Sequence, residues 1–351
     1  MRIRFVTPPA AKRVGGIENA VEGLREALHH QGIEVVQGGD PSDADAVHHF
    51  HGLWDLSHSR LAARLRDLRR PYVVSPHGML EPWAFRHRRW KKLPYFWLFE
   101  RRFLAGAGSL FVTSVMEAKH LARVILHQRV ETLALGCRDR RGPNHAAARQ
   151  ALGWPPDGRV ILFLSRIDVK KGLDMLLHAM AGVQGWQSWR LVVVGDGDPA
   201  YVASLKSLAA AAISRLPKVE WIGPVWGEAR WHYLQGADLF CLPTHSENFG
   251  LAVLEALHAG TPVLTTDQTP WGAYSGLNGI FIAKPEVWSV QQALAVARVR
   301  IEQDWTLENR RDLAVWADER FAWTMLGPMY VEAYARANGI ESAKLFPGCS
   351  L

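Results

Sequence analysis

Apolar and polar positions in the first part of the chain predict strands that alternate with helices. Short apolar runs typical of buried strands are separated by segments in which apolar residues recur at helical spacing. In residues 18–30, for example, Leu24 and Leu28 fall on one helical face. This alternation predicts a parallel sheet that helices cover on both sides. The expected strands are residues 3–6, 33–36, 46–50, 72–74 and 110–112, and the other expected helices are 59–68 and 116–126.

A second alternating series follows an irregular stretch, residues 136–158, which is rich in Arg, Pro and Gly and is the candidate linker. The chain then ends in a mostly helical tail, 288–339, with a kink expected at Gly327 and Pro328. The pattern therefore predicts an α/β protein with two doubly wound Rossmann-like domains and a ligand in the cleft outside the carboxyl ends of the strands. In the second series, strands are expected at 160–164, 191–194, 219–222, 239–242 and 263–265, and helices at 173–181 and 201–212.

Composition fits this picture and narrows the class of protein. The chain has 351 residues, which suggests two domains of ordinary size, and its 48% hydrophobic and 21% charged content is that of a globular protein. Its three cysteines are isolated in sequence, so neither a disulfide framework nor a zinc site is expected, which favours a reducing compartment. The N-terminus lacks the apolar region of a signal peptide, and no apolar run is long enough to span a bilayer. We therefore expect a cytoplasmic protein.

The charge is unevenly distributed. The formal net charge is +7, which suits an anionic partner such as nucleic acid, acidic lipid or a phosphorylated substrate. Residues 85–102 contain seven Lys or Arg and one Glu, interleaved with six aromatic residues. This segment could lie on an anionic membrane or hold a phosphate-bearing acceptor. It could also be an amphipathic helix whose basic face is exposed to solvent and binds nothing. We favour a membrane surface or a lipid-linked acceptor, which would make the protein peripheral on the inner face of the cell membrane.

Two acids bracket the most informative string, Ser246 to Val263. The expected strand 239–242 ends at a proline, a polar turn follows, and a helix begins near Gly250. Glu247 lies in that turn, and Glu255 lies inside the helix. Backbone N–H groups at a helix N-terminus favour an anion, so one acid could face a sugar and the other a ribose, with phosphates between them.

This string resembles the Glu-x7-Glu signature of retaining GT-B glycosyltransferases, family 4. The resemblance implies two Rossmann-like domains facing each other across a cleft. Residues 1–140 would form an acceptor-binding domain, onto which a C-terminal helix from about 320–351 packs back, and residues 155–318 would bind the nucleotide sugar. Thr269, Pro270 and Trp271 resemble an element of members that build bacterial surface polysaccharides, including lipopolysaccharide, although its role is not evident from the sequence.

The implied activity is transfer of a hexosyl group from a UDP- or GDP-sugar to a hydroxyl of a glycan or lipid-linked glycan, with retention of anomeric configuration. In this family the leaving phosphate is thought to take the acceptor proton, so no protein base is assigned. Glu247 would position the donor sugar, and Glu255 would bind ribose hydroxyls. The implied catalytic residues are Glu247, His77, Arg166 and Lys171. The implied substrate-binding residues are Gly15, Gly16, Arg166, Lys171, Gly195, Val225, Asn248, Phe249, Gly250, Leu251 and Glu255.

Most of these residues follow an expected strand, where a cleft would lie. Arg166 and Lys171 resemble the family's Arg…Lys-Gly phosphate site, since Arg offers a bidentate donor and Lys a compact charge. His77 would contact the donor sugar or the leaving phosphate. Gly195 either ends a strand in a simple turn or forms the floor of the nucleotide site. The backbone near Val225 would contact the base.

Some features of these loops stay open. Gly15 and Gly16 form a loop between the first strand and the first helix, which would approach the leaving phosphate and the acceptor. Trp226, next to the base contact, is either a stacking or a core residue.

Neither a cofactor nor a protein-bound metal is expected. His48, His49 and His51 look like metal ligands, but only His49 and His51 could share a face of a strand, and no acid is nearby. Three rival functions remain: a GT-B epimerase or phosphorylase, a nicotinamide oxidoreductase, for which the glycine fingerprint is missing, and a basic nucleic-acid binder. The last leaves the Glu247 string unexplained, so we expect no nucleic-acid partner.

Overall fold

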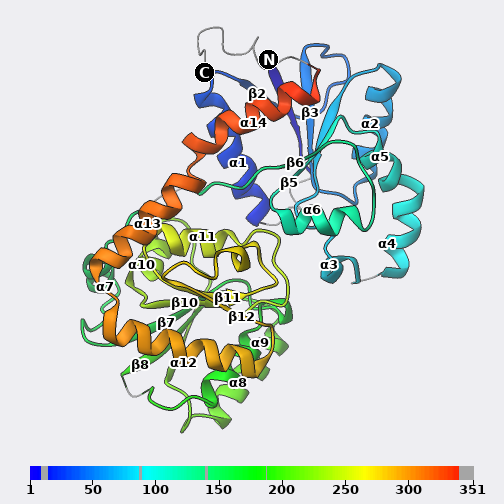
Figure 1. The fold of residues 1–351 in the computed structure, drawn as a ribbon. Helices are drawn as coiled ribbons and strands as arrows, with labels where there is room; N and C mark the ends of the chain where they lie inside the picture. Colours follow the sequence, from blue (N-terminus) through cyan, green and yellow to red (C-terminus); the bar gives the residue numbers. More distant parts are fainter. Residues whose placement is uncertain (9–14, 87–88, 139–140, 187, 340–351) are drawn as a thin grey trace. The chain divides into compact units, whose positions relative to one another are not determined.

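The computed structural model describes residues 1–8, 15–86, 89–138, 141–186 and 188–339. The chain forms two compact units (Figure 1). The N-terminal unit consists of Met1–Arg138 together with Arg320–Leu351, and the C-terminal unit consists of Asp139–Glu319. The chain thus leaves the first unit, builds the second, and returns to the first.

The N-terminal unit has a six-stranded parallel sheet in the order β2-β1-β3-β4-β5-β6. Its central strands are buried along most or all of their length, which explains their apolar sequences. The strands are β1 (Arg2–Val6), β2 (Glu34–Gln37), β3 (Ala46–His51), β4 (Tyr72–Ser75), β5 (Ser109–Val112) and β6 (Val130–Thr132). Helices of this unit include α1 (Gly15–His30), α2 (Leu56–Asp67), α6 (Val115–Ala122) and α14 (Trp323–Ala337).

Helix α14 is part of the N-terminal core, although it is separated in sequence from the rest of the unit. Its Trp323, Tyr330 and Tyr334 pack in one apolar cluster with Leu24 and Leu28 of α1. The helix continues through Gly327 and Pro328, so the kink expected at these residues does not end it and stays a prediction. The break between α13 (Leu307–Phe321) and α14 falls at Ala322, whose backbone is extended. Residues 340–351 lie outside the described part of the chain.

The basic aromatic segment is not one amphipathic helix. It forms a series of short helical pieces, one of which is a π-helix, a rare form that often marks functional sites. Residues 87–88 lie outside the described part of the chain. The pieces are α3 (Pro82–Arg86), α4 (Arg89–Tyr95), the π-helix η2 (Phe96–Glu100) and α5 (Arg101–Ala105).

The C-terminal unit repeats the plan with a six-stranded parallel sheet in the order β12-β11-β10-β7-β8-β9. The expected irregular linker is partly wrong, since it contains helix α7 (His145–Ala151). The strands are β7 (Arg159–Leu164), β8 (Trp189–Val194), β9 (Lys218–Gly223), β10 (Leu239–Leu242), β11 (Val263–Thr266) and β12 (Ile280–Ala283). The helices include α8 (Leu173–Ala181), α9 (Pro199–Ala211), α10 (Ala229–Gly236), α11 (Leu251–His258), α12 (Val287–Asp304) and α13 (Leu307–Phe321).

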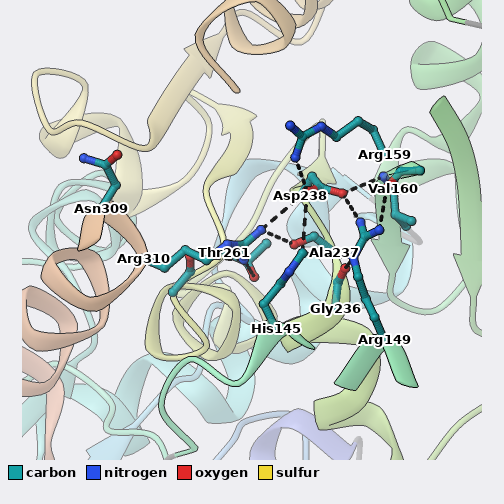
Figure 2. Close-up of polar contacts among 12 residues, drawn as sticks. His145, Arg149, Arg159, Val160, Gly236, Ala237, Asp238, Thr261, Asn309 and Arg310 are labelled. Atoms are coloured by element: carbon teal, nitrogen blue, oxygen red, sulfur yellow. Dashed lines mark hydrogen bonds and ion pairs between the residues drawn. The ribbon is translucent and has the colours of Figure 1, made fainter. Parts of the chain in front are cut away.

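A buried carboxylate ties this unit together at the amino ends of β7 and β10 (Figure 2). Asp238 is 1% exposed and forms ion pairs with Arg149 and with Arg159, the latter at 3.1 Å. The oxygen that pairs with Arg149, Oδ2, also accepts the Val160 N–H at 2.8 Å. Arg310 of α13 adds a third guanidinium 3.7 Å away and donates to the Ala237 carbonyl. One acid therefore joins the first helix, the sheet and the last helix of the unit.

Candidate active site

The loops after β7 and β10 lie next to each other at the opposite, carboxyl edge of the C-terminal sheet. β7 and β10 are paired, and the chain order reverses between them, with β8 and β9 on one side and β11 and β12 on the other. Open α/β sheets bind ligands outside the carboxyl ends of the strands at such a switch point. Both loops, residues 165–172 and 243–250, carry motifs singled out in the sequence.

Direct contacts hold the two loops together. The Thr244 hydroxyl and the His245 N–H both donate to the Lys170 carbonyl, each at 2.8 Å. Gly172 adopts a left-handed conformation with φ +70°, and a Cβ there would overlap the Pro243 carbonyl. Only glycine permits this approach, so the Lys-Gly sequence has a steric cause within the protein itself.

The first acid of the motif forms an ion pair with the lysine of the facing loop. Glu247 Oε2 contacts Lys171 Nζ, and both side chains are largely buried, at 15% and 13% exposed. Burial alone would raise the pKa of Glu247, but the ammonium groups of Lys171 and Lys170 and a hydrogen bond from the Asn248 N–H hold it below its ordinary value. Glu247 is therefore ionised at neutral pH and pairs with a cation that is itself suited to an anionic ligand.

A buried tryptophan fixes the turn that carries Glu247. Trp271 is 1% exposed, and its indole N–H donates to the Phe249 carbonyl at 2.6 Å. The two rings meet edge to face with centroids 5.5 Å apart. Gly250 has φ +81°, and a Cβ there would press on Trp271 and on Glu247. The Thr-Pro-Trp element thus has a definite structural role, which is to hold the Glu247 turn in shape.

Helix α11 begins directly after this turn. Gly250 is its N-cap, and Leu251 is its first residue. The first N–H groups of a helix have no partner within it, and the helix dipole favours negative charge there. The structure therefore brings the backbone of Asn248, Phe249, Gly250 and Leu251 to one helix N-terminus beside the Lys171–Glu247 pair.

Two other residues were expected near the phosphates: Arg166, an exposed cation, and Gly195, which lies in a tightly packed turn. Arg166 is exposed in the loop after β7, and within the described residues its guanidinium makes no hydrogen bond or ion pair. Gly195 has φ +141°, and its N–H donates to the Gly223 carbonyl at 2.8 Å. A Cβ at Gly195 would overlap the Ser165 carbonyl. This glycine is thus required for packing against the Arg166 loop, whether or not it also contacts a ligand.

The second acid of the motif faces α10. Glu255 is 6% exposed, and its Oε1 lies 2.8 Å from a guanidinium nitrogen of Arg230. Arg230 follows the loop in which the sequence suggested base contacts through Val225. Trp226 of that loop is 77% exposed, so its alternative role as a core residue is wrong. Val225 is half-buried beside it.

In the N-terminal unit, His77 lies in a strained turn after β4. Its φ is +51°, which is unusual for a residue other than glycine. His77 Nε2 lies 3.1 Å from His51 Nδ1, and the two rings are stacked. Desolvation lowers the pKa of His77 to about 4, so the ring is neutral at pH 7. The turn is held by Glu117, whose buried carboxylate accepts the N–H groups of Gly78 and Thr113.

The histidines of β3 belong to the core. His49 and His51 share a face of the strand as expected, with ring centroids 3.8 Å apart. His49 also contacts the Tyr334 hydroxyl at 2.6 Å and the Ser75 hydroxyl at 2.8 Å. Among the described residues, no group of three or more His, Cys, Asp or Glu side chains is arranged to hold a metal ion.

Gly15 and Gly16 form the first turn of α1 rather than a loop before it, so their expected position is corrected. The loop they were expected to form, residues 9–14, lies outside the described residues. The roles of these glycines toward substrate stay predictions.

The basic aromatic segment presents large apolar side chains to solvent. Trp90 is 73% exposed, Trp97 63% and Leu98 70%. Cations lie over two of the rings, with Lys91 Nζ 4.7 Å from the Trp90 centroid and Arg101 5.1 Å from that of Trp97. Among the described residues, no helix combines the length and the apolar character that crossing a bilayer would demand.

The sequence analysis missed Glu117 in the N-terminal unit and, in the C-terminal unit, Arg230 and the structural role of Trp271. Glu117 had a local signal, because Ser114 three residues earlier forms a helix cap with its N–H. Arg230 had none, since its partner Glu255 lies on another helix. Pairings across elements cannot be obtained from local spacing.

Two family models match the chain, one in each half of the sequence. The model of glycosyl transferases group 1 matches residues 144–295, and that of glycosyltransferase family 4 matches residues 40–139. The chain therefore belongs to the group 1, family 4 glycosyltransferases, which have the two-domain Rossmann-like architecture called GT-B.

Among particular relatives, the chain is 30% identical to a D-inositol 3-phosphate glycosyltransferase of Saccharomonospora viridis, over 68% of this chain and 58% of that protein. It is 34% identical to a phosphatidyl-myo-inositol mannosyltransferase of Mycobacterium leprae, over 35% of this chain and 32% of that protein. The chain thus spans less than two thirds of the length of these curated relatives.

Solved structures agree on the fold over nearly the whole chain. Sucrose-phosphate synthase from Thermosynechococcus elongatus has a TM-score of 0.75 at 18% identity, covering 96% of this chain and 99% of that one. Anabaena Alr3699/HepE in complex with UDP and glucose has a TM-score of 0.71 at 18% identity, covering 95% and 99%. At this identity, the likeness establishes the fold alone.

Proposed function

We propose that the protein transfers a hexosyl group from a nucleotide diphosphate sugar, UDP- or GDP-linked, to an acceptor hydroxyl with retention of configuration. The observation that carries this proposal is the Lys171–Glu247 pair at the N-terminus of α11, beside the switch point between β7 and β10. A diphosphate needs cations and backbone N–H donors together, and this place offers both.

The site residues then have distinct tasks. Arg166 and Lys171 stabilise the diphosphate as it departs, where negative charge grows in the transition state. Glu247, ionised and held by the Trp271-supported turn, positions the donor sugar. Glu255 binds the ribose hydroxyls. The departing phosphate takes the acceptor proton, so the reaction uses no protein base. In this proposal the cations Arg166 and Lys171 supply the positive charge, and no metal takes part.

His77 would act as a hydrogen-bonding group and not as an acid. Its pKa of about 4 leaves it neutral over the physiological range. A neutral imidazole offers one donor and one acceptor, which suits a sugar hydroxyl. His51 Nδ1 already faces Nε2 of His77, so the remaining nitrogen, Nδ1, would face the substrate.

The acceptor we propose is a glycan or lipid-linked glycan of cell-surface polysaccharide synthesis, such as lipopolysaccharide. The exposed tryptophans and cations of residues 85–102 support this choice, because aromatic rings insert at a lipid surface while Lys and Arg attract anionic headgroups. The protein would then act as a peripheral protein on the inner face of the membrane, with the N-terminal unit binding the acceptor.

A thermal-shift panel of UDP, GDP, ADP and their sugars tests the donor class, because a ligand that binds only the folded state raises Tm. One nucleotide should stabilise the protein clearly more than the others. The matching sugar nucleotide, incubated with lipid-linked glycan, should give a product whose anomeric configuration equals that of the donor by NMR. An inverted anomer would contradict retention. Free sugar without acceptor, or strict dependence on phosphate, would identify an epimerase or a phosphorylase instead.

A further inference from the structure

Each acid of the motif is paired with a cation from a neighbouring strand–helix unit. Lys171, after β7, holds Glu247, and Arg230, after β9, holds Glu255. Only the first cation has a part in the proposed chemistry. The second pair is equally enclosed, since the side chains of Arg230 and Glu255 are 19% and 8% exposed. A buried pair of this kind fixes the geometry of both partners, because separating them leaves a charge without compensation.

Arg230 contacts a carboxylate oxygen of Glu255 through its guanidinium group. Its terminal nitrogen lies 2.8 Å from Oε1, and its Cζ lies 5.9 Å from the centroid of the buried Trp231 ring. A carboxylate offers about four acceptor positions over its two oxygens, so a carboxylate can in general accept both a guanidinium and hydroxyl donors. Hydrogen bonds to a charged group are stronger than those between neutral groups.

The same arginine begins the helix that follows the exposed Trp226. Glycines with positive φ, Gly223 at +86° and Gly227 at +62°, flank the Pro-Val-Trp stretch. Arg230 lies in the first turn of α10, directly after this loop. The contact to Glu255 therefore anchors the loop beside α11.

We propose that Arg230 is a positioning residue that aims Glu255 at the ribose hydroxyls and couples ribose recognition to the base-contacting loop, residues 223–228. This inference rests on the proposed function, because it takes the ligand to be a ribonucleotide. It adds a specificity determinant: the site selects ribose over deoxyribose through a side chain that does not itself touch the sugar.

The test measures the binding of two ligands, with and without the ribose hydroxyls, to wild type and to variants of Arg230. The nucleoside diphosphate among UDP, GDP and ADP that raises wild-type Tm most is compared with its 2′,3′-dideoxy counterpart by calorimetry. Wild type should bind the ribonucleotide roughly 10- to 100-fold more tightly, as expected for hydrogen bonds to a charged group. In Arg230→Met that ratio should fall to about threefold or less, and Arg230→Lys should restore part of it.

A matched control is Arg190→Met. Arg190 pairs with Glu220 at 3.5 Å with similar exposure, 17% and 21%, but lies at the start of β8, away from the carboxyl ends of the strands. This variant should keep the wild-type ratio. An unchanged ratio in Arg230→Met, even with lowered Tm or uniformly weaker binding, would overturn the proposal and leave the transferase function standing. Failure of wild type to bind any of the three nucleotides would overturn both.

Discussion

At the residue scale, Glu247 and Lys171 form an ion pair in which each charge already has its partner. Their contact keeps Glu247 ionised despite its burial, and it neutralises the lysine until a more strongly charged anion arrives. In the proposed function, a diphosphate would take over the lysine, which would leave the carboxylate beside the donor sugar. The pair therefore offers a direct link between binding the phosphates and orienting the acid.

Glu247→Gln tests this link. The amide keeps the shape but loses the charge, so turnover should fall at least about 100-fold, the usual loss for one electrostatic contact to a transition state. Nucleotide affinity should stay within about threefold of wild type, because Lys171 remains available to the phosphates. Initial rates of sugar transfer and calorimetric titration with the nucleotide measure the two effects. Equal turnover in mutant and wild type would remove Glu247 from the mechanism.

Much of this site was visible in the sequence because its parts are contiguous. The Glu247 turn, the start of α11 and the Lys-Gly loop each follow a strand, and strand-end position alone brings them to one edge of a sheet. The residues that hold these loops in place could not be identified from the sequence. Trp271 and Arg230 act on elements distant in sequence, and nothing in their local spacing specifies those partners.

At the element scale, the π-helix η2 explains why residues 85–102 do not form one helix. Glu100 ends this piece and is fully buried, and it accepts the Trp54 N–H at 2.8 Å. Its apolar surroundings, with Asp55 nearby, raise the pKa of Glu100 to about 7, although the Trp54 hydrogen bond opposes this. Glu100 is thus a buried residue, although the segment around it is basic and looks solvent-exposed in the sequence. The helical period gave no sign of this, because a π-helix shifts the register by one residue.

Burial of Glu100 predicts a stability that depends on pH. The folded pKa, about 7, lies above the unfolded value, so the folded state binds the extra proton between them. Stability should therefore be highest below about pH 4.5 as far as this group is concerned, and it should fall as pH rises toward 7. Glu100→Gln removes the titration but keeps the acceptor for Trp54, and it should raise stability at pH 8 on the order of 3 kcal/mol.

Urea unfolding at pH 5 and pH 8 measures this effect. The difference in unfolding free energy between Glu100→Gln and wild type should be larger at pH 8. A matched control is Glu332→Gln, whose side chain is 49% exposed and should show no such difference. The same difference at both pH values would contradict a raised pKa for Glu100.

At the scale of the whole molecule, the alternation of strands and helices was enough to predict two Rossmann-like units. The discontinuity of the N-terminal unit was not derivable from periodicity, because a returning helix has the same pattern as any other. The sequence pattern also omitted the edge strands β6 and β12. β6 has three residues, two of them exposed, so it lacks the apolar run of a buried strand.

Asp238 is expected to carry much of the stability of the C-terminal unit. Asp238→Asn leaves the buried guanidinium groups of Arg149 and Arg310 without their counter-charge, which should cost about 3–5 kcal/mol. Burial would raise the pKa of Asp238, but its His145, Arg149 and Arg310 neighbours hold it below the ordinary value. Its contribution is therefore present above the unfolded carboxyl pKa, near 4, and is lost as pH falls through the lower folded value.

Thermal and urea unfolding of Asp238→Asn check this expectation. Asp304→Asn serves as the control, because Asp304 pairs with Arg300 at the surface, where ion pairs contribute at most about 1 kcal/mol. Equal effects of the two substitutions at pH 7 would show that the Asp238 cluster is not a major source of stability.

The proposed contact with anionic membranes is testable on the protein as a whole. Replacing the exposed Lys91, Arg101 and Arg102 by Gln should reduce co-sedimentation with vesicles that contain phosphatidylserine, since each cation near such a surface contributes about 1 kcal/mol. The control replaces three exposed cations of the C-terminal unit: Arg215, Lys284 and Arg311. An equal loss of co-sedimentation in both variants would attribute vesicle binding to net charge alone. Unchanged co-sedimentation of the first variant would refute the membrane contact.

The Asp238 cluster also determines which boundaries suit a recombinant fragment of the C-terminal unit. A recombinant fragment that starts at residue 155 would discard His145 and Arg149, which are two of the positively charged or polar neighbours of the buried Asp238, and would keep Arg159 and Arg310 near that carboxylate. One that starts at residue 142 keeps His145 and Arg149, together with the Gly142 carbonyl that accepts a hydrogen bond from Gln235. A nucleotide-binding half made for calorimetry or crystallisation should therefore run from 142 to 319, with its first helix treated as part of the domain and not as a dispensable tether.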